Sequence, residues 1–170
     1  VSPETVMRLR FVPALLAAAM LAGCSIPLMI EPDPLEDATA VYSWQAEGRM
    51  IFECTYDTEG FYWAFVRPEG SLTSETGRIE ATIENDFGLT HRDGSHLEAK
   101  IIRQGMAKSP NDLKDALFEV SSASERGALR AIRYVERRRS EGGMPLTVCS
   151  ASQRGMHLAV PFRARWILYR

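Results

Sequence analysis

The segment from Met156 to Leu168 alternates apolar and polar side chains more regularly than any other part of the chain. This period of two is that of a β-strand, whereas an α-helix would need a period of 3.6 residues. Pro161 lies within the segment and indicates an edge strand or a bulge, because proline has no amide hydrogen to donate. The face expected to point to the core consists of Met156, Leu158, Val160, Phe162, Ala164, Trp166 and Leu168.

Shorter segments with strand character precede this one. Residues 50–56, 79–84 and 97–101 alternate in the same way, and residues 61–66 form a continuous apolar and aromatic run. We therefore predict a mainly β fold, an antiparallel β-sandwich or barrel-like single domain over residues 41–170 with at most short helices. The turn signals between the segments are Glu69-Gly70, Asp93-Gly94, Gly127 and Gly142-Gly143.

The amino-terminal segment has the three parts of a secretory signal. Arg8 and Arg10 form the basic part, residues 11–21 the apolar part, and Ala22-Gly23 the small-residue exit. The apolar run is too short for a membrane span, which needs about 20 apolar residues. The small residues Ala22-Gly23 and the Cys24 that follows them resemble the lipobox of bacterial lipoproteins. In these proteins the signal peptide is removed and the cysteine is acylated.

This resemblance implies a cellular address for the protein. Residues 1–23 would be a lipoprotein signal peptide, and acyl chains on Cys24 would hold the protein permanently on the membrane. Ser25 follows the cysteine, which in such lipoproteins implies the outer membrane and a domain that faces the periplasm. A plain signal peptide with a chance cysteine is the alternative. Residues 24–40 contain prolines among acidic residues, which is typical of a flexible tether.

The chain has three cysteines. If Cys24 carries lipid, Cys54 and Cys149 remain as a single possible pair, and an oxidising compartment favours a disulfide between them. Two free buried thiols are the alternative. The sequence contains no CxxC spacing, so we expect the disulfide to be structural rather than catalytic.

Five segments carry a family resemblance. They are GRMIFEC (48–54), FYWAFVRPEGSLTSETG (61–77), DGSHLEAKI (93–101), LRAIRYVERRRSEGGMPLTVC (129–149) and AVPFRARWILY (159–169). In this order they are similar to the uncharacterised bacterial and fungal family called domain of unknown function 3455. Met50, Phe52 and Leu89 stand where that family tends to have glutamine, tyrosine and tryptophan. If these positions line a binding site, the resemblance implies that the site is altered in this chain.

Two segments have helical propensity. Ser109 could cap a helix that begins at Pro110, and residues 124–143 are rich in helix formers and end in two glycines. The family resemblance implies strands instead, so we prefer strands for residues 109–121 and 124–141.

Charge is divided unevenly between the halves of the mature chain. Residues 24–98 carry 4 basic and 15 acidic side chains, and residues 99–170 carry 14 basic and 6 acidic ones. Interleaved halves would turn this asymmetry into internal complementarity; otherwise the basic half could face anionic lipid. The run Arg137-Arg138-Arg139 is expected to be a solvated polar face, with binding of anionic head groups as the alternative. Nucleic acid is not expected as a partner outside the cytoplasm.

The segment THRDGSH suggests a metal site. If Asp93-Gly94 is a two-residue hairpin loop, His91 lies opposite His96, and their imidazoles could reach one metal ion. A third ligand would come from His157 or from Asp86. Two exposed histidines at a loop tip are the simpler interpretation, and we expect no cofactor.

Other catalytic motifs are missing from the sequence. There is no GxSxG motif and no phosphate-binding glycine loop. Asp57 and Glu59 are expected in a solvated turn. Phe61, Trp63 and Phe65 are expected in the core rather than on a sugar-stacking platform.

The sequence therefore favours binding over catalysis. We predict a non-catalytic envelope module that binds or scaffolds a partner protein, a glycan, an anionic lipid or an apolar ligand within reach of the membrane. The alternative is an envelope enzyme that uses a metal ion held by His91 and His96.

Overall fold

The computed structural model describes residues 32–170, and the compact unit in this part of the chain runs from Asp33 to Arg170. The expected signal peptide and Cys24 lie outside the described residues. The unit contains eight strands and two 3-10 helices. They are β1 (Ala40–Asp57), β2 (Gly60–Thr73), β3 (Ile79–Ile83), η1 (Asn85–Phe87), β4 (Leu89–His91), β5 (His96–Gln104), β6 (Ala116–Ala123), β7 (Tyr134–Gly142), η2 (Ala151–Gln153) and β8 (His157–Tyr169).

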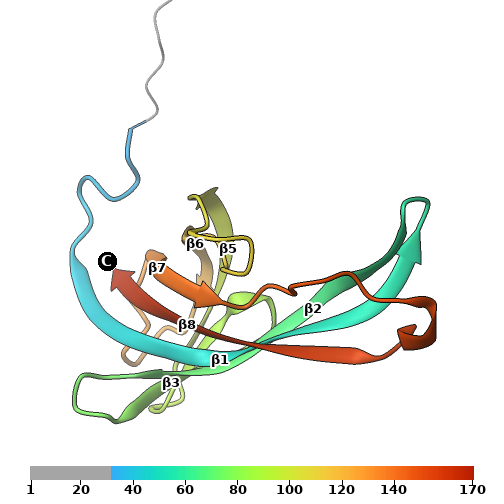
Figure 1. Ribbon diagram of the computed structural model, residues 1–170. Coiled ribbons are helices and arrows are strands. Elements are labelled where there is room, and N and C mark those ends of the chain that lie inside the picture. Colours follow the sequence, from blue (N-terminus) through green and yellow to red (C-terminus); the bar gives the residue numbers. More distant parts are fainter. Residues whose placement is uncertain (1–31) are drawn as a thin grey trace, which may run out of the picture. The chain divides into compact units, whose positions relative to one another are not determined.

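Each strand pairs with the next one along the chain, and all the pairs are antiparallel. β8 returns to pair with β1, which closes the sheet into a barrel (Figure 1). Closure is one way to leave a sheet without an exposed edge. The predicted fold class, mainly β and antiparallel with only short helices, is confirmed. Within residues 32–170, no helix has the length and apolar character that crossing a membrane requires.

The preference for strands over helices at residues 109–121 and 124–141 is confirmed only for the later part of each segment, because residues 109–115 and 124–133 form turns and loops. Each of them contributes one strand to the barrel, β6 from the first and β7 from the second. Phe118 of β6 and Val135 of β7 pair in register, and both side chains are buried. Tertiary pairing therefore overrides the local helical preference, as it often does when strands bury apolar residues.

The long strands β1, β2 and β8 continue past the barrel. Figure 1 shows their shared extension running beyond β3–β7 to the Asp57–Gly60 turn. The inward face predicted for β8 is confirmed from Phe162 to Leu168, where it is buried. Met156 is 54% exposed because that end of the segment belongs to the extension rather than to the core.

The aromatic residues of β2 lie in this extension and are more exposed than the sequence predicts. Phe65 is 46% exposed, and Phe61 and Trp63 are half-buried. The prediction that all three lie in the core is wrong for Phe65, because β2 pairs only with β1 over these residues, whereas Trp63 packs against the edge of the core.

One glycine pair lets β1 and β2 approach closely inside the barrel. Gly48 lies directly opposite Gly70 in the register of the two strands. A Cβ on Gly48 would clash with the backbone carbonyl of Glu69, so no other residue fits there without a shift of the backbone.

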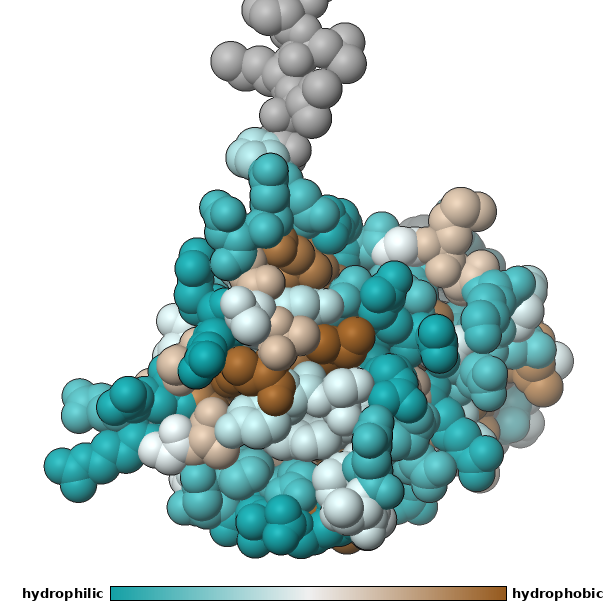
Figure 2. Space-filling model, turned by 90° about the vertical axis from the view of Figure 1, so that its left-hand side faces the viewer, coloured by the Kyte–Doolittle hydropathy of each residue, from teal (hydrophilic) through white to brown (hydrophobic). Residues whose placement is uncertain are grey.

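The core lies inside the barrel and is made of residues from every strand. Figure 2 shows that the outer face turned to the viewer is mostly hydrophilic, with hydrophobic residues gathered near its centre. This division between inside and outside follows the period of two along each strand. The largest fully buried apolar side chains are Trp166, Phe118, Met50, Leu72, Leu89, Leu97, Leu129, Leu168 and Val135.

The predicted disulfide is present. Cys54 of β1 and Cys149 of the β7–β8 connection are joined across a sequence separation of 95 residues. The bond fixes the β7–β8 connection to the strand extension, together with two backbone hydrogen bonds that join Cys54 to Gly155 and Met156.

We expect reduction of this disulfide to destabilise the domain. In the chain-entropy model, a cross-link closing a loop of this length stabilises the folded state by about 4 to 5 kcal/mol. Urea unfolding with and without a thiol reductant measures the difference. The Cys54→Ser/Cys149→Ser double variant is the control, since the reductant should leave its midpoint unchanged. Equal midpoints for the reduced and oxidised wild type would contradict the prediction.

Candidate ligand-binding site

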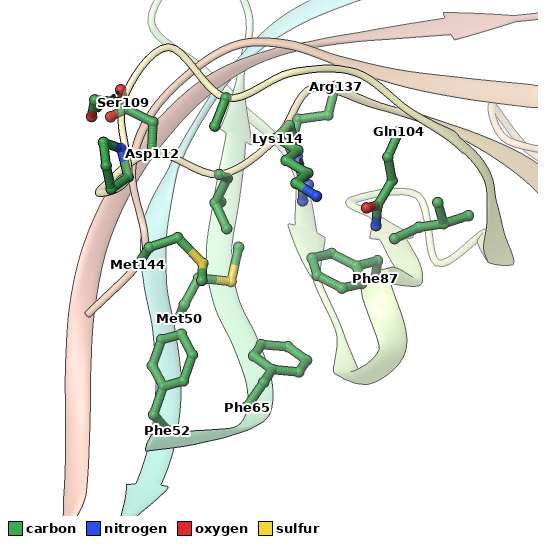
Figure 3. A pocket seen from close by; sticks show the side chains of 14 residues that line it. Met50, Phe52, Phe65, Phe87, Gln104, Ser109, Asp112, Lys114, Arg137 and Met144 are labelled. Atoms are coloured by element: carbon green, nitrogen blue, oxygen red, sulfur yellow. Dashed lines mark hydrogen bonds between the residues drawn. The ribbon is translucent and has the colours of Figure 1, made fainter. Parts of the chain in front are cut away.

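A mainly apolar pocket of about 450 Å³ opens between the strands and the loops at one side of the barrel (Figure 3). This volume lies within the range of small-molecule sites, about 300 to 1,000 Å³. Its lining comes from β1, β2, η1, β5, β7 and the connections that follow β5 and β7. The lining residues are Met50, Phe52, Phe65, Phe87, Ile101, Gln104, Ala107, Ser109, Pro110, Asp112, Leu113, Lys114, Arg137 and Met144.

Aromatic rings form a continuous row from the pocket into the core. Phe52 contacts Phe65 edge to face, with ring centroids 5.9 Å apart, and Phe65 stacks on Phe87 at 5.8 Å. Phe87 then lies 5.5 Å from Phe118, whose ring stacks on Trp166 at 5.7 Å. Such pairs each contribute about 0.5 to 1.5 kcal/mol beyond the area they bury. The row gives the pocket a wall that is apolar along its length.

Phe87 reaches this position through an unusual backbone. Asp86 and Phe87 have φ values of 56° and 65°, in the left-handed region that bulky residues rarely adopt. Gly88 follows, and a Cβ there would lie 3.0 Å from the carbonyl oxygen of Leu97. Backbone strain of this kind persists where the surrounding structure holds it, and it is concentrated at functional sites. The η1 turn therefore places an aromatic ring in the pocket at a local conformational cost.

The loop after β5 forms a second wall and is fixed to the end of β7. The amide of Gly142 donates to Asp112 Oδ1 at 2.7 Å, and the amide of Leu113 donates to the Gly142 carbonyl at 2.8 Å. Gly143 has φ 91°, and a Cβ on it would lie only 2.6 Å from the Leu113 side chain. Asp112 also accepts from Ser109 Oγ at 2.8 Å. These hydrogen bonds hold the pKa of Asp112 below its ordinary value, the Gly142 amide contributing most.

Arg137 is the one charged residue of the lining that is buried, with 3% of its surface exposed. It follows Val135 on the inward face of β7 and pairs with Ala116 on β6 and Trp166 on β8, both buried. The expectation that Arg137-Arg138-Arg139 forms a polar face is therefore wrong for Arg137, which lies on the inward face of β7, whereas Arg138 and Arg139 are exposed as expected.

The guanidinium of Arg137 is held by the backbone and by two rings. Its Nε and Nη2 donate to the Lys114 carbonyl at 3.3 and 2.8 Å, and its Cζ lies 5.4 Å from the centre of the Phe87 ring and 5.6 Å from that of Phe118. Nη1 is buried and has no hydrogen-bond partner among residues 32–170. Cation–π contacts with desolvated cations contribute about 2 kcal/mol each, against several kcal/mol for removing an ion from water. The contacts in the described chain therefore only partly compensate this charge.

Burial lowers the pKa of Arg137 to about 10, while the charge of Asp115 acts in the opposite direction. The side chain is still a cation at neutral pH. Asp115 makes no salt bridge with it in the described part of the chain, and its Oδ1 accepts instead from the amide and the hydroxyl of Ser140, both at 3.1 Å. The pocket thus combines apolar walls with one buried positive charge.

The predicted pairing of His91 with His96 is wrong. His96 lies opposite Thr90, and the amide of His91 bonds to the carbonyl of Ser95, so the turn is longer than two residues. A register shift of one residue moves a side chain to the other face of a sheet. His91 is accordingly buried, whereas His96 is exposed and bonds to Ser124 Oγ at 2.9 Å.

The other residues considered as metal ligands are also separated. His157 is on β8 with its Nε2 3.6 Å from Glu53 Oε2, and Asp86 is exposed in η1. Residues 32–170 contain no group of three or more histidine, cysteine, aspartate or glutamate side chains placed to hold a metal ion. Asp57 and Glu59 lie at the exposed β1–β2 turn, as expected.

His91 belongs to a charged cluster on the barrel wall rather than to the pocket. Its Nδ1 lies 2.9 Å from Asp93 Oδ1, its Nε2 lies 3.8 Å from Glu80 Oε2, and its ring stacks on Trp44. Glu80 is buried and accepts from Arg78 Nε and Arg92 Nε, each at 2.8 Å. The Arg78 hydrogen bond, more than that of Arg92, holds the pKa of Glu80 below its ordinary value.

Two of the three positions that depart from the family pattern lie in the pocket. Met50 and Phe52 line it, whereas Leu89 is buried in the core. Sequence reasoning missed Phe87 and Met144 as site residues, and it considered Arg137 only as one of three arginines whose alternative role was to bind anionic head groups. The alternation of side chains along β7 could have indicated that Arg137 faces inward, because Arg137 lies two residues after Val135 and therefore on the same face of the strand.

Comparison with known proteins finds no matching family model, no matching curated protein and no matching solved structure. The resemblance to domain of unknown function 3455 therefore stays a prediction.

We expect the Glu80→Gln variant to be less stable than wild type at neutral pH and this deficit to shrink in acid, because the wild type then loses the contribution of its carboxylate. A carboxylate whose pKa is lower in the folded state stabilises the fold above its unfolded pKa, and this contribution disappears as the pH falls through the folded pKa. Below its ordinary value of 4.5 the difference between wild type and variant should therefore shrink. Urea unfolding at neutral and acidic pH measures it, with Glu75→Gln, an exposed carboxylate, as the control. A deficit of equal size at both pH values would contradict the assignment.

Proposed function

We propose that the protein is a non-catalytic binding protein that holds a small, largely apolar molecule in the pocket between Phe65, Phe87 and Met144. The observation that carries the proposal is the pocket itself, which has an aromatic wall, a suitable volume and a buried polar group. Small-molecule sites in proteins are typically concave and apolar, with a few polar groups that fix the orientation of the ligand.

The barrel supports this role because it makes the pocket largely preformed. Met50 and Phe52 are on β1, which is hydrogen-bonded on both sides, and Phe65 is on the adjacent strand. The loop wall is tied to β7 by the hydrogen bonds of Asp112 and Leu113. A preformed site loses less conformational entropy when a ligand binds.

The alternative function, a metal enzyme acting through His91 and His96, has less support. It depended on the two imidazoles lying directly opposite each other, and they lie on opposite faces of the barrel wall. The binding proposal depends on neither histidine.

Binding of a neutral fluorescent probe tests the proposal. We expect N-phenyl-1-naphthylamine to bind the purified domain saturably with one site per chain, with the fluorescence increase of a dye that leaves water. Phe65→Ala should weaken this binding about 3- to 10-fold, because it removes the ring that stacks on Phe87.

Tyr62→Ala is the matched control for this experiment. Tyr62 is a partly exposed aromatic residue of the same strand that does not line the pocket, so its removal should leave the affinity unchanged. Fluorescence that rises without saturation, or equal weakening by both substitutions, would show that the dye binds elsewhere.

We further propose that the protein acts at the bacterial outer membrane, attached through lipid on Cys24 and facing the periplasm. The support is the lipobox-like sequence described above and the disulfide, which suits an oxidising compartment. The tether would let the pocket exchange its ligand with the membrane or with an envelope partner.

Metabolic labelling tests the anchor. Cells that express the full chain should incorporate a clickable palmitate analogue into the wild-type protein, and Cys24→Ala should remove the label. The Cys54→Ser/Cys149→Ser double variant is the control, since it removes the other two cysteines without leaving a free thiol and should keep the label per amount of protein. Label retained by Cys24→Ala would reject the lipid anchor while leaving the pocket proposal intact.

A further inference from the structure

We propose that the ligand of this pocket is an amphiphile with an anionic head group, and that Arg137 binds this head group inside the barrel. The inference rests on the proposed function and specifies its ligand. Arg137 lines the pocket, is 3% exposed and has a buried Nη1 without a partner in the described chain. A buried donor on a cation is satisfied best by a charged oxygen.

The acidic residues near Arg137 are occupied elsewhere. Asp112 receives the Gly142 amide and the Ser109 hydroxyl, and Asp115 Oδ1 receives both donors of Ser140. None of the salt bridges within residues 32–170 includes Arg137. Asp115 acts on Arg137 through its charge without a salt bridge, and an anionic ligand would supply the direct partner that Nη1 lacks in the described chain.

A second buried donor lies beside Arg137. Trp166 is its direct partner across β7 and β8, and the indole Nε1 of Trp166 also lacks a hydrogen-bond partner in this part of the chain. Paired residues have Cβ atoms about 4.5 to 5.5 Å apart on the same face of a sheet. Trp166 does not line the pocket, so Arg137 is the donor that reaches the head group, and Trp166 adds a second unsatisfied donor to the same layer of the core.

The aromatic row sets the direction of the apolar part. Phe87 lies against the Arg137 guanidinium, Phe65 stacks on Phe87, and Phe52 follows Phe65. Exposure increases from Arg137 to Phe65, which is 46% exposed. In the view of Figure 3, Arg137 and Lys114 lie on one side of the pocket and Met50, Phe52 and Met144 on the other. We therefore infer a head group at Arg137 and an alkyl chain that runs outward along the rings.

Displacement of the neutral probe by matched ligands tests this inference. The ligands are decanol, decanoate and decyl phosphate, which share one chain and differ in the head group. We expect at least one of the two anions to bind wild type about 10- to 100-fold more tightly than decanol, a range typical of hydrogen bonds to a charged group. Whichever anion binds more tightly identifies the head group as a carboxylate or a phosphate.

Two variants assign the preference to one residue. Arg137→Met keeps the length of the side chain without its charge and should remove the preference for the anion while decanol still binds. Arg138→Met makes the same change on the neighbouring residue, which is exposed and does not line the pocket, and should retain the preference. High salt should also leave the wild-type preference largely intact, because buried charges are screened much less than exposed ones.

The outcomes separate this inference from the proposed function. If decanol binds as tightly as both anions, or if both variants lose the preference equally, the role of Arg137 is rejected while the pocket remains a binding site. If neither the probe nor any decyl ligand binds, the proposed function fails with it. If Arg137→Met does not fold, NMR of the wild type replaces it. The Arg137 Nε–H resonance should then shift when the preferred anion binds and not when decanol binds. No shift on anion binding rejects the inference.

Discussion

Hydrogen bonding between β1 and β8 is the interaction on which the rest of this structure depends. It joins the first and last strands of the sheet along nearly the whole of their length. Because the sheet is closed, its concave side is an interior, and side chains that alternate along each strand are sorted into buried and exposed sets. Trp166 is fully buried for this reason, and Arg137 shares its face. Closure of the barrel therefore buries the positive charge of Arg137 beside aromatic rings.

Much of the fold could be predicted from the sequence because strand periodicity is local. The β8 segment alternates with a period of two, which is that of a strand and not of a helix, and the two cysteines within residues 32–170 form the disulfide. Register is different, since it depends on how many residues a turn contains. The turn after His91 is longer than the Asp93-Gly94 dipeptide suggests, and this single difference moves His96 to the other face.

The candidate site was harder to predict because its residues come together only in the closed barrel. Arg137 is followed by two more arginines, and a run of like charges usually lies in solvent. Its burial depends on the partners that β6 and β8 place beside it, and these belong to distant parts of the sequence. The position of the Phe87 ring depends on a turn with left-handed backbone angles, which no local sequence motif predicts. Met50 and Phe52 stood out earlier, although only as departures from a family pattern.

The point where the backbone enters the barrel and the point where it leaves are neighbours. Thr39 and Arg170 exchange both of their backbone hydrogen bonds, at 2.9 and 3.0 Å. A short linker could therefore join residue 170 to residue 39, and new ends could be opened at the β1–β2 turn, far along the chain from the pocket loops. Such a circular permutant would keep every strand pair and would present a surface tag from the tip of the extension.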